Sequence, residues 1–276
     1  MRVLLTGDRG VLGRPTRAAL ERAGHEVRGF DAAAGDDVLD AAAVRAAASG
    51  CEAIVHLAGI PGDREDDASR VMAVNVCGTW NVLLAARAAG VRRVVHASSG
   101  KALGMLERDP DHLPVDDGHR GLPSRPYALS KWLAEEMCEA FTAETGVATI
   151  CLWPVFVADA EAWARLRDLD ELPPAPGRAW HLGVIVDVRD VADAFAAAVT
   201  CPDPGHRRLL LCAEEIASDR PTAEVVRERL PGVPWRGAEP PAGSRRALVD
   251  GSAAQAVLGW RPRHGWRDRG GLRAEA

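Results

Sequence analysis

The sequence predicts an α/β fold in which a doubly wound parallel sheet is followed by a small, discontinuous C-terminal lobe. Through the first 154 residues, short apolar runs alternate with stretches of helical periodicity. This alternation is typical of right-handed βαβ units and a parallel sheet. A glycine-rich turn joins the first apolar run to the first helical stretch, and after Pro154 the chain becomes irregular and rich in proline.

The individual elements follow from local pattern. Strands are predicted where short runs of apolar residues are bounded by polar residues or glycine; these lie at 2–6, 25–30, 53–57, 91–97 and 147–152. Helices are predicted where apolar residues recur three and four positions apart; these lie at 12–23, 41–49, 68–89 and 127–144. The segment between Asp31 and Asp37 is short, so we expect an abbreviated strand there.

The second half of the chain is divided between the sheet and the lobe. One more strand and helix are predicted at 184–186 and 190–199, and a short strand at 209–212. The proline-rich segments at 171–177 and 231–243 are typical of loops. We therefore expect one domain to comprise residues 1–154 and 181–201, and the lobe to comprise residues 155–180 and 202–276.

The composition is that of an ordinary globular protein. Of the 276 residues, 47% are hydrophobic and 26% are charged, which excludes a disordered, collagen-like or coiled-coil chain. The formal net charge of −5 argues against a nucleic-acid partner. No uninterrupted apolar run reaches the roughly 18 residues of a membrane span. The six cysteines and eight histidines show no metal-ligand spacing, so we expect reduced thiols, no bound metal and a cytoplasmic protein.

The turn after the first predicted strand has the form of a dinucleotide-binding fingerprint. Residues 6–13 read TGDRGVLG, which places Gly7, Gly10 and Gly13 between a strand and a helix. Glycines there allow a tight turn and close approach of the backbone to a pyrophosphate, which the N-terminus of the following helix attracts. The sequence therefore predicts a Rossmann domain that binds a dinucleotide.

Asp31 predicts which dinucleotide is bound. It ends the second predicted strand, 18 residues after Gly13. A carboxylate in that place accepts hydrogen bonds from the adenosine ribose and repels a 2′-phosphate. We therefore expect NAD in preference to NADP.

Tyr127 and Lys131 form the clearest candidate for catalysis. Tyrosine occurs once in the chain, and Lys101 and Lys131 are the two lysines among 34 cationic side chains. A spacing of four on a helix puts Tyr127 and Lys131 on one face. The ammonium group favours the phenolate form of the tyrosine, which can then exchange a proton with an alcohol or carbonyl.

With these motifs, the chain resembles the short-chain dehydrogenase/reductase superfamily, and most of all its extended branch, the NAD-dependent epimerase/dehydratase family. The resemblance covers about residues 2–265. It rests on the glycine turn, Asp31, HLAG at 56–59, NVCGT at 75–79, Ser98 and Ser99, the Tyr127 and Lys131 pair, IVDVRDVA at 185–192 and LGWRP at 258–262.

The resemblance implies roles for individual residues. Ser99 would polarise the reacting oxygen, Tyr127 would act as acid and base, and Lys131 would hold the nicotinamide ribose. Glu135 would pair only along its helix. The implied cofactor contacts are Gly7, Gly10, Val11, Leu12, Gly13, Asp31, Asp37, Val38, Leu57, Ala58, Gly59, Asn75, Tyr127, Lys131 and Pro154.

Departures from the family pattern reduce the number of substrate classes that we expect. The two positions after Ser99 are Gly100 and Lys101, where the family's dehydratases carry two carboxylates, so we do not expect dehydration. WPVFVAD at 153–159 lacks the arginine, asparagine and tyrosine that the family often has there, which argues against a nucleotide-sugar. The short chain and the absence of tyrosine before Gly104 are similar to uronate dehydrogenases of the same branch, although their characteristic segment after the sixth strand is not visible. The candidate substrate residues are Gly100, Lys101, Arg125, Val155, Phe156 and Arg189.

The expected activity is hydride transfer between NAD and a hydroxyl or carbonyl carbon of a small polar, sugar-like substrate. Two alternatives stay open: a sugar or nucleotide-sugar epimerase that keeps its NAD, and a dinucleotide-sensing protein without turnover. The resemblance further implies a homodimer through the helices at 68–89 and 127–144.

Overall fold

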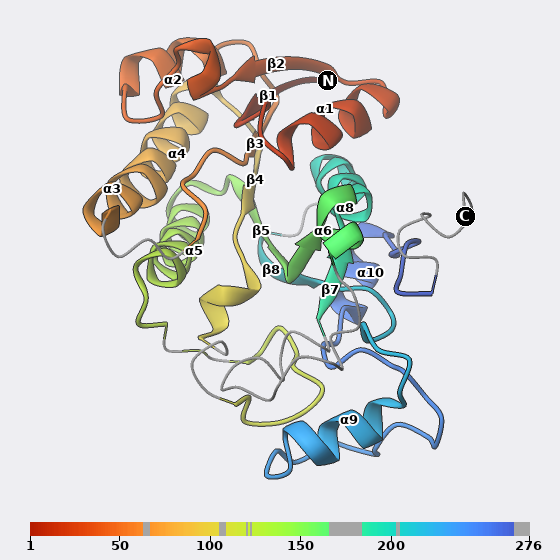
Figure 1. The fold of residues 1–276 in the computed structure, drawn as a ribbon. Coiled ribbons are helices and arrows are strands. Elements are labelled where there is room, and N and C mark those ends of the chain that lie inside the picture. Colours follow the sequence, from red (N-terminus) through yellow and green to blue (C-terminus); the bar gives the residue numbers. More distant parts are fainter. Residues whose placement is uncertain are drawn as a thin grey trace.

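The computed structural model describes residues 1–62, 67–104, 109–119, 121, 123–165, 184–202 and 205–267. At its centre is a six-stranded parallel sheet in the order β2-β1-β3-β4-β5-β8 (Figure 1). The strands are β1 (Arg2–Thr6), β2 (Glu26–Phe30), β3 (Ala53–His56), β4 (Arg93–Ala97), β5 (Ala148–Pro154) and β8 (His206–Leu211). The chain leaves β1 toward β2 on one side and then crosses to β3 on the other. The predicted doubly wound fold is thereby confirmed.

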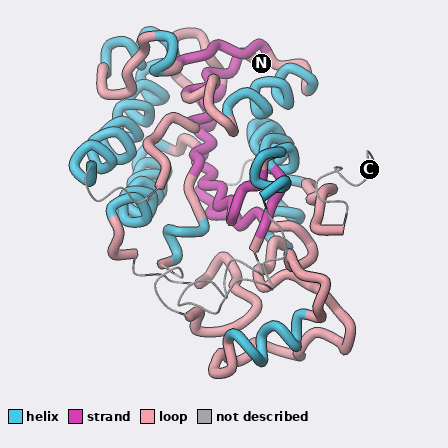
Figure 2. Tube along the Cα trace, in the orientation of Figure 1, coloured by secondary structure: helices cyan, strands magenta, loops and turns pink. Residues whose placement is uncertain are grey.

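Helices cover both faces of the sheet (Figure 2). On one face pack α1 (Gly13–Arg22), α8 (Val188–Thr200) and α10 (Ser252–Leu258); on the other pack α2 (Ala41–Ala48), α4 (Gly78–Ala89) and α5 (Pro126–Thr145). Successive strand residues point to opposite faces. Val3 and Leu5 therefore join the first helical layer, while Leu4 between them joins the second.

The predicted helix at 68–89 is continuous but not uniform. It comprises α3 (Ala68–Met72), a π-helical segment (Ala73–Cys77) and α4. Among the described residues, the run Ala68–Ala89 is the one helix long and apolar enough by composition to cross a membrane. In the fold its α4 part packs in the core against α2 and α5, as a core helix with this composition does.

Two expectations about strands were wrong. Between Asp31 and Asp37 the chain forms a short 3₁₀ turn, η1 (Ala32–Ala34), and no strand, so β2 is the edge of the sheet. The strand expected in the lobe at 209–212 is β8, which pairs with β5 and completes the central sheet. The division of the chain into two domains stays a prediction. Residues 166–183, which include the proline-rich run 171–177, lie outside the described residues.

A further hydrophobic core joins the two predicted domains. It includes α9 (Thr222–Arg229), which the sequence analysis missed, and packs Ile216 and Leu248 from the predicted lobe against Leu113, Val115 and Trp153 from the predicted first domain. A second, two-stranded sheet is formed by β6 (Phe156–Ala158) and β7 (Ile185–Asp187). Helix α6 (Ala160–Arg165) follows β6 in the chain. These short elements lie beyond the carboxyl end of β5, where they flank the site described below.

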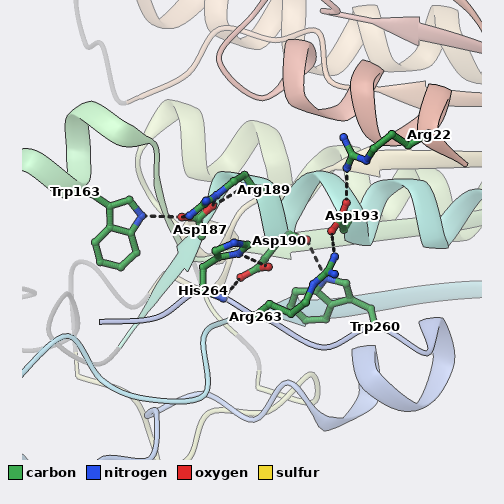
Figure 3. Close-up of polar contacts among 9 residues, drawn as sticks. All are labelled: Arg22, Trp163, Asp187, Arg189, Asp190, Asp193, Trp260, Arg263 and His264. Carbon is green, nitrogen blue, oxygen red and sulfur yellow. Dashed lines mark hydrogen bonds and ion pairs between the residues drawn. The ribbon is translucent and has the colours of Figure 1, made fainter. Parts of the chain in front are cut away.

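The segment after α10 is fastened to the start of α8 (Figure 3). The fully buried carboxylate of Asp190 accepts hydrogen bonds from the backbone N and ring Nδ1 of His264, both at 2.9 Å. The indole Nε1 of Trp260 donates to the Asp190 carbonyl oxygen at 2.8 Å. One turn further along α8, Asp193 pairs with Arg22 and Arg263. The C-terminal segment is thus held against the layer formed by α1 and α8.

Candidate active site

The turn between β1 and α1 is shaped by glycine. Gly7 has a φ of 73°, and a Cβ there would lie 2.7 Å from the backbone N of Ala58. A Cβ on Gly13 would overlap the carbonyl oxygen of Gly7. A side chain at Gly7 would therefore push the turn away from the end of β3, and one at Gly13 would push the start of α1 away from the turn. This is the close backbone packing that a dinucleotide fingerprint requires.

A cavity of about 530 Å³ lies where β1, β2 and β3 end, at the point where the strand order reverses. This is the position at which open α/β sheets bind their ligands. Its wall contains eight of the predicted cofactor residues: Gly7, Gly10, Asp31, Asp37, Val38, Leu57, Ala58 and Gly59. It also contains residues that the sequence analysis did not select: Phe30, Ala32, Gly35, Asp36, Leu39, Ile60, Arg70 and Val74.

Three carboxylates face this cavity. Asp31 accepts hydrogen bonds from the backbone N of Arg9 at 2.9 Å and of Ala33 at 2.8 Å, and Asp36 accepts one from the backbone N of Asp31 at 2.9 Å. Asp37 accepts one from Leu39. The adjacent acidic pair at 36 and 37 was the available signal for Asp36. Arg70 lies in the same wall, so the cavity carries charges of both signs.

A second cavity, of about 210 Å³, adjoins the first at the carboxyl ends of β4 and β5. The two share Leu57, Gly59 and Ile60 in their walls, so they are neighbours at the end of β3. The remaining wall of the second cavity is Leu12, Pro61, Ala97, Ser98, Ser99, Tyr127, Lys131, Pro154, Val155 and Val157. The predicted catalytic residues Ser99, Tyr127 and Lys131 are all in this wall.

Helix α5 places Tyr127 and Lys131. Its first residue is Pro126, whose fixed φ suits the first helical position, so Tyr127 lies at the helix start and Lys131 one turn on. The Lys131 Nζ is 5.8 Å from the centroid of the Tyr127 ring and donates to the carbonyl oxygen of Ala97 at 2.7 Å. Burial lowers the pKa of Lys131 to about 8.

The two neighbouring serines differ in their contacts. The hydroxyl of Ser99 accepts a hydrogen bond from the backbone N of Lys101 at 3.2 Å and caps the 3₁₀ turn η4 (Gly100–Leu103). Ser98 is buried, and its hydroxyl donates to Glu135. Both serines line the second cavity, and Ser98 is the one whose hydroxyl is bonded to a buried side chain.

Glu135 does not pair along its helix, contrary to expectation. Only 1% exposed, it accepts hydrogen bonds from Ser98 and, at 2.6 Å, from the indole Nε1 of Trp153. The Arg208 Nε lies 3.4 Å from its other oxygen. Burial raises the pKa of Glu135 to about 8. Glu135 thus links α5 to residues at the ends of β4 and β5, which the sequence could not show because all three partners are distant in the chain.

Asn75 lies behind the groove rather than in its wall. It sits in the π-helical segment; such segments are frequent at functional sites. Its side chain accepts from the backbone N of Ile60 at 2.8 Å and donates to the carbonyl of Ile60 and to Ser130. Ile60 lines both cavities, and Ser130 precedes Lys131. Of the predicted cofactor residues, Val11, Gly13 and Asn75 do not line either cavity.

The candidate substrate residues separate into two groups. Val155 lines the second cavity, Gly100 packs close to Val155, and the Lys101 Nζ is 5.6 Å from the centroid of the Tyr127 ring. The guanidinium of Arg189 is instead paired with Asp187 at 2.8 and 2.9 Å, and Asp187 also accepts from the indole of Trp163 (Figure 3).

Two further candidates are exposed. Arg125 is the residue before α5, and Phe156 lies on β6 with 42% of its surface exposed. Neither lines the second cavity. Of the six candidates, Val155 lines the second cavity with Tyr127, and Lys101 lies beside the Tyr127 ring without lining that cavity.

The chain is similar in sequence to known proteins. A "Uronate dehydrogenase" of Pseudomonas syringae pv. tomato is 32% identical over 166 residues, which cover 55% of this chain and 58% of that protein. The match therefore spans little more than half the length of that curated relative.

Solved structures match along the whole chain. A short-chain dehydrogenase/reductase superfamily protein from Agrobacterium tumefaciens with bound NAD has a TM-score of 0.75 at 26% identity, covering 100% of this chain and 98% of that one. The UDP-glucose 4-epimerase of Thermus thermophilus in complex with NAD has a TM-score of 0.72 at 25% identity, covering 99% and 97%.

The family model described as the NAD dependent epimerase/dehydratase family matches residues 3–158. That stretch runs from β1 through β6 and includes the residues that line both cavities. A match over more than half of the chain, on a fold shared along its whole length, shows that this chain belongs to the NAD-dependent epimerase/dehydratase family.

Proposed function

We propose that this protein transfers hydride reversibly between NAD and the hydroxyl or carbonyl carbon of a small polar substrate such as a sugar derivative. One observation carries the proposal: Ser99, Tyr127 and Lys131 line a cavity that shares three wall residues with the groove at the glycine turn. A dinucleotide in that groove would have its adenosine at the carboxylates and its nicotinamide beside Tyr127.

The groove fits NAD. Gly7 leaves room against Ala58 that a Cβ would fill, and Asp31, Asp36 and Asp37 supply acceptors for ribose hydroxyls. When bound, NAD supplies the hydride acceptor for oxidation, and its reduced form supplies the donor for the reverse reaction. Lys131, which is buried beside Tyr127, is placed to hold the ribose next to the nicotinamide.

The side chains would manage the proton. During oxidation Tyr127, in its phenolate form, takes the proton from the substrate hydroxyl while the hydride leaves the carbon. The positive charge of Lys131 stabilises that phenolate. Ser99 donates a hydrogen bond to the same substrate oxygen and holds it as its charge changes.

Epimerisation is the second candidate, because the fold matches a UDP-glucose 4-epimerase along nearly its whole length. In that case the same three residues would oxidise and re-reduce one substrate carbon, and NAD would stay bound. A non-catalytic dinucleotide sensor is the third reading; it would not require Ser99, Tyr127 and Lys131 to meet in one cavity.

The cofactor content of the purified protein separates these readings. The protein is denatured, and the released dinucleotide is identified and quantified by mass spectrometry. Near-stoichiometric NAD would favour epimerisation, and an empty protein would favour exchangeable NAD as co-substrate. If added NAD does not bind to the empty protein, both enzymatic readings fail.

The Tyr127→Phe variant tests the mechanism. Turnover should fall by about 10²- to 10⁴-fold, the usual contribution of a general acid or base, while NAD affinity measured by calorimetry stays within about twofold. Retained activity in this variant would exclude Tyr127 as the proton-transferring group.

We also propose a homodimer through α4 and α5. The exposed Trp80 on α4, with 41% of its surface accessible, supports this arrangement. Light scattering of the wild type and of Trp80→Glu should show a dimer and a weakened dimer respectively.

A further inference from the structure

The glycine turn contains a buried charge that the proposed function does not use. Asp8 lies between Gly7 and Gly10 and is 8% exposed. Its carboxylate Oδ2 accepts a hydrogen bond from the Nη2 of Arg17 at 2.6 Å. The start of α1 packs against the backbone of the same residue, since a Cβ on Gly13 would overlap the Asp8 carbonyl carbon. A negative charge is therefore fixed in the turn at which we propose that the pyrophosphate binds.

Arg17 reaches Asp8 from the second turn of α1. Its other terminal nitrogen, Nη1, donates to the carbonyl oxygen of Val27 on β2 at 3.3 Å, so the guanidinium joins the turn to the edge strand. Arg9, the neighbour of Asp8 in the chain, directs its guanidinium to the carbonyl oxygen of Ala33 instead. Among the residues that the structure describes, Arg17 is the one cation within ion-pair distance of Asp8.

Gly29 on β2 leaves the space that this ion pair occupies. A Cβ at Gly29 would overlap both the Nη2 of Arg17 and the Oδ2 of Asp8. The φ of Gly29, unlike the 73° of Gly7, does not lie in the left-handed region, so the backbone does not require glycine there. The ion pair is therefore the feature that a side chain at this position would disturb.

An unbalanced carboxylate would oppose the ligand of the turn. A pyrophosphate is negatively charged, and backbone N–H groups and the positive end of the α1 dipole attract it. A carboxylate in the same turn repels it, and the repulsion is stronger where burial keeps water away from the charge. A guanidinium in contact with that carboxylate cancels most of its field at the ligand.

We propose that Arg17 is a positioning residue of the cofactor site: it holds and neutralises Asp8 so that the glycine turn accepts a pyrophosphate, and residue 29 is glycine to admit the pair. The inference deepens the proposed function and rests on it, because it takes the dinucleotide to bind at the turn. Arg17 acts through Asp8 and need not touch the ligand. The effect applies to every ligand that carries the pyrophosphate, and it is separate from the choice between NAD and NADP proposed for Asp31 and Asp36.

A double-mutant cycle tests the inference through binding. Calorimetry gives the dissociation constants of NAD and ADP-ribose for the wild type, Arg17→Met, Asp8→Asn and the double variant. Ligand-observed NMR gives the binding of adenosine, which has no phosphate. Gly29→Ala, alone and combined with Asp8→Asn, disturbs the pair while leaving the arginine in place. Arg22→Met is the matched control, because it removes the same charge from the exposed end of α1, where Arg22 pairs with Asp193.

Arg17→Met should raise the dissociation constants of NAD and ADP-ribose by about 10-fold, the effect of one unit charge near an anion in partly solvated surroundings. Gly29→Ala should raise them too, whereas Asp8→Asn and Arg22→Met should stay within about threefold of the wild type. Adding Asp8→Asn to Arg17→Met or to Gly29→Ala should restore that range. Adenosine binding should change by less than about twofold. The loss in Arg17→Met should also shrink in about 0.5 M NaCl, because salt screens a repulsion between charges.

A purely structural role of the ion pair predicts a different pattern. The double variant would then bind NAD no better than Arg17→Met, adenosine affinity would fall together with NAD affinity, and salt would not reduce the loss. Any of these results, or full NAD affinity in Arg17→Met, would overturn the inference and leave the proposed function intact.

Two further outcomes are decided by the same measurements. Thermal unfolding shows whether each variant folds, and if Arg17→Met does not, Gly29→Ala with and without Asp8→Asn is judged by the same criteria. If the wild type binds neither NAD nor ADP-ribose, the proposed function fails and the inference fails with it.

Discussion

At the scale of single residues, we propose that two carboxylates select between NAD and NADP. Asp31 was predicted from its distance to the glycine turn, but the structure adds Asp36, whose carboxylate accepts from the backbone N of Asp31. Both line the adenosine cavity. Two carboxylates within one short turn repel a ribose 2′-phosphate more strongly than one does, so discrimination against NADP should be shared between them.

Removing either carboxylate should relax that preference. In Asp31→Ala and in Asp36→Ala, the ratio of the dissociation constants for NADP and NAD should move toward NADP by about 10-fold, the effect of one unit charge at a few ångströms in partly solvated surroundings. The measurement is calorimetric titration with both dinucleotides. Asp40→Asn is the matched control, because Asp40 caps α2 and lies outside the cavity wall. An unchanged ratio in both alanine variants would remove these residues as the basis of selection.

At the scale of elements, α5 carries the chemistry and also organises its surroundings. Tyr127, Lys131 and Glu135 follow one another at intervals of four, so they lie along one face of the helix. The first two line the second cavity, and the third binds Ser98 and Trp153 at the ends of β4 and β5. One helix thus positions both the acid–base pair and the strand ends that flank it.

The buried Glu135 should make stability depend on pH. Its pKa rises from an ordinary 4.5 to about 8 on folding, chiefly through burial. Between these values the folded state binds more protons than the unfolded state, so the free energy of unfolding falls as pH rises from about 5 to 8. Glu135→Gln should lack this fall, and its stability relative to wild type should therefore improve across that interval. Urea denaturation at pH 5, 6.5 and 8 measures the difference.

A nearby exposed glutamate, Glu139, provides the control for that measurement. Glu139→Gln removes an exposed carboxylate that also pairs with Arg208, and its difference from wild type should stay nearly constant over the same pH values. Parallel pH profiles for wild type and Glu135→Gln would show that Glu135 is ionised throughout, as its contacts with Ser98, Trp153 and Arg208 would favour.

At the scale of the whole molecule, contacts between distant segments close the fold. The C-terminal segment is held on α8 by Asp190, which is fully buried and bonded to His264 (Figure 3). Asp187, just before the same helix, pairs with Arg189 and Trp163 and so ties α6 to the start of α8. The start of α8 is therefore a junction between the sheet domain, the flanking α6 and the chain end.

Asp190 should be worth much more to stability than its neighbour on the same helix. Asp190→Ala removes the buried acceptor of two hydrogen bonds from the partly buried His264 and should lower the free energy of unfolding by about 1–3 kcal/mol. Asp193→Ala removes two ion pairs to exposed arginines and should cost less than about 1 kcal/mol. Urea denaturation of both variants measures the contrast, and equal losses would show that the buried contacts do not fasten the segment.

Much of the fold was predictable because the pattern that specifies it is local. Apart from the abbreviated strand expected between Asp31 and Asp37, the predicted strands and helices of the first half are present, with ends that differ by a few residues at most. The elements that were missed, β6, α6, α9 and α10, are three to eight residues long. Such short elements are stabilised by packing against the rest of the molecule rather than by their own periodicity.

The sequence by itself determined the order of strands and helices, the glycine turn and the spacing of Tyr127 and Lys131, because each is a relation between residues close in the chain. Only the tertiary structure decided that β8 completes the sheet, that Glu135 turns to Ser98 and Trp153, and that Arg189 pairs with Asp187 while Lys101 reaches Tyr127. Most of these contacts join segments far apart in sequence. Which of several chemically suitable partners a side chain meets there depends on how the layers pack, and local periodicity carries no information about that choice.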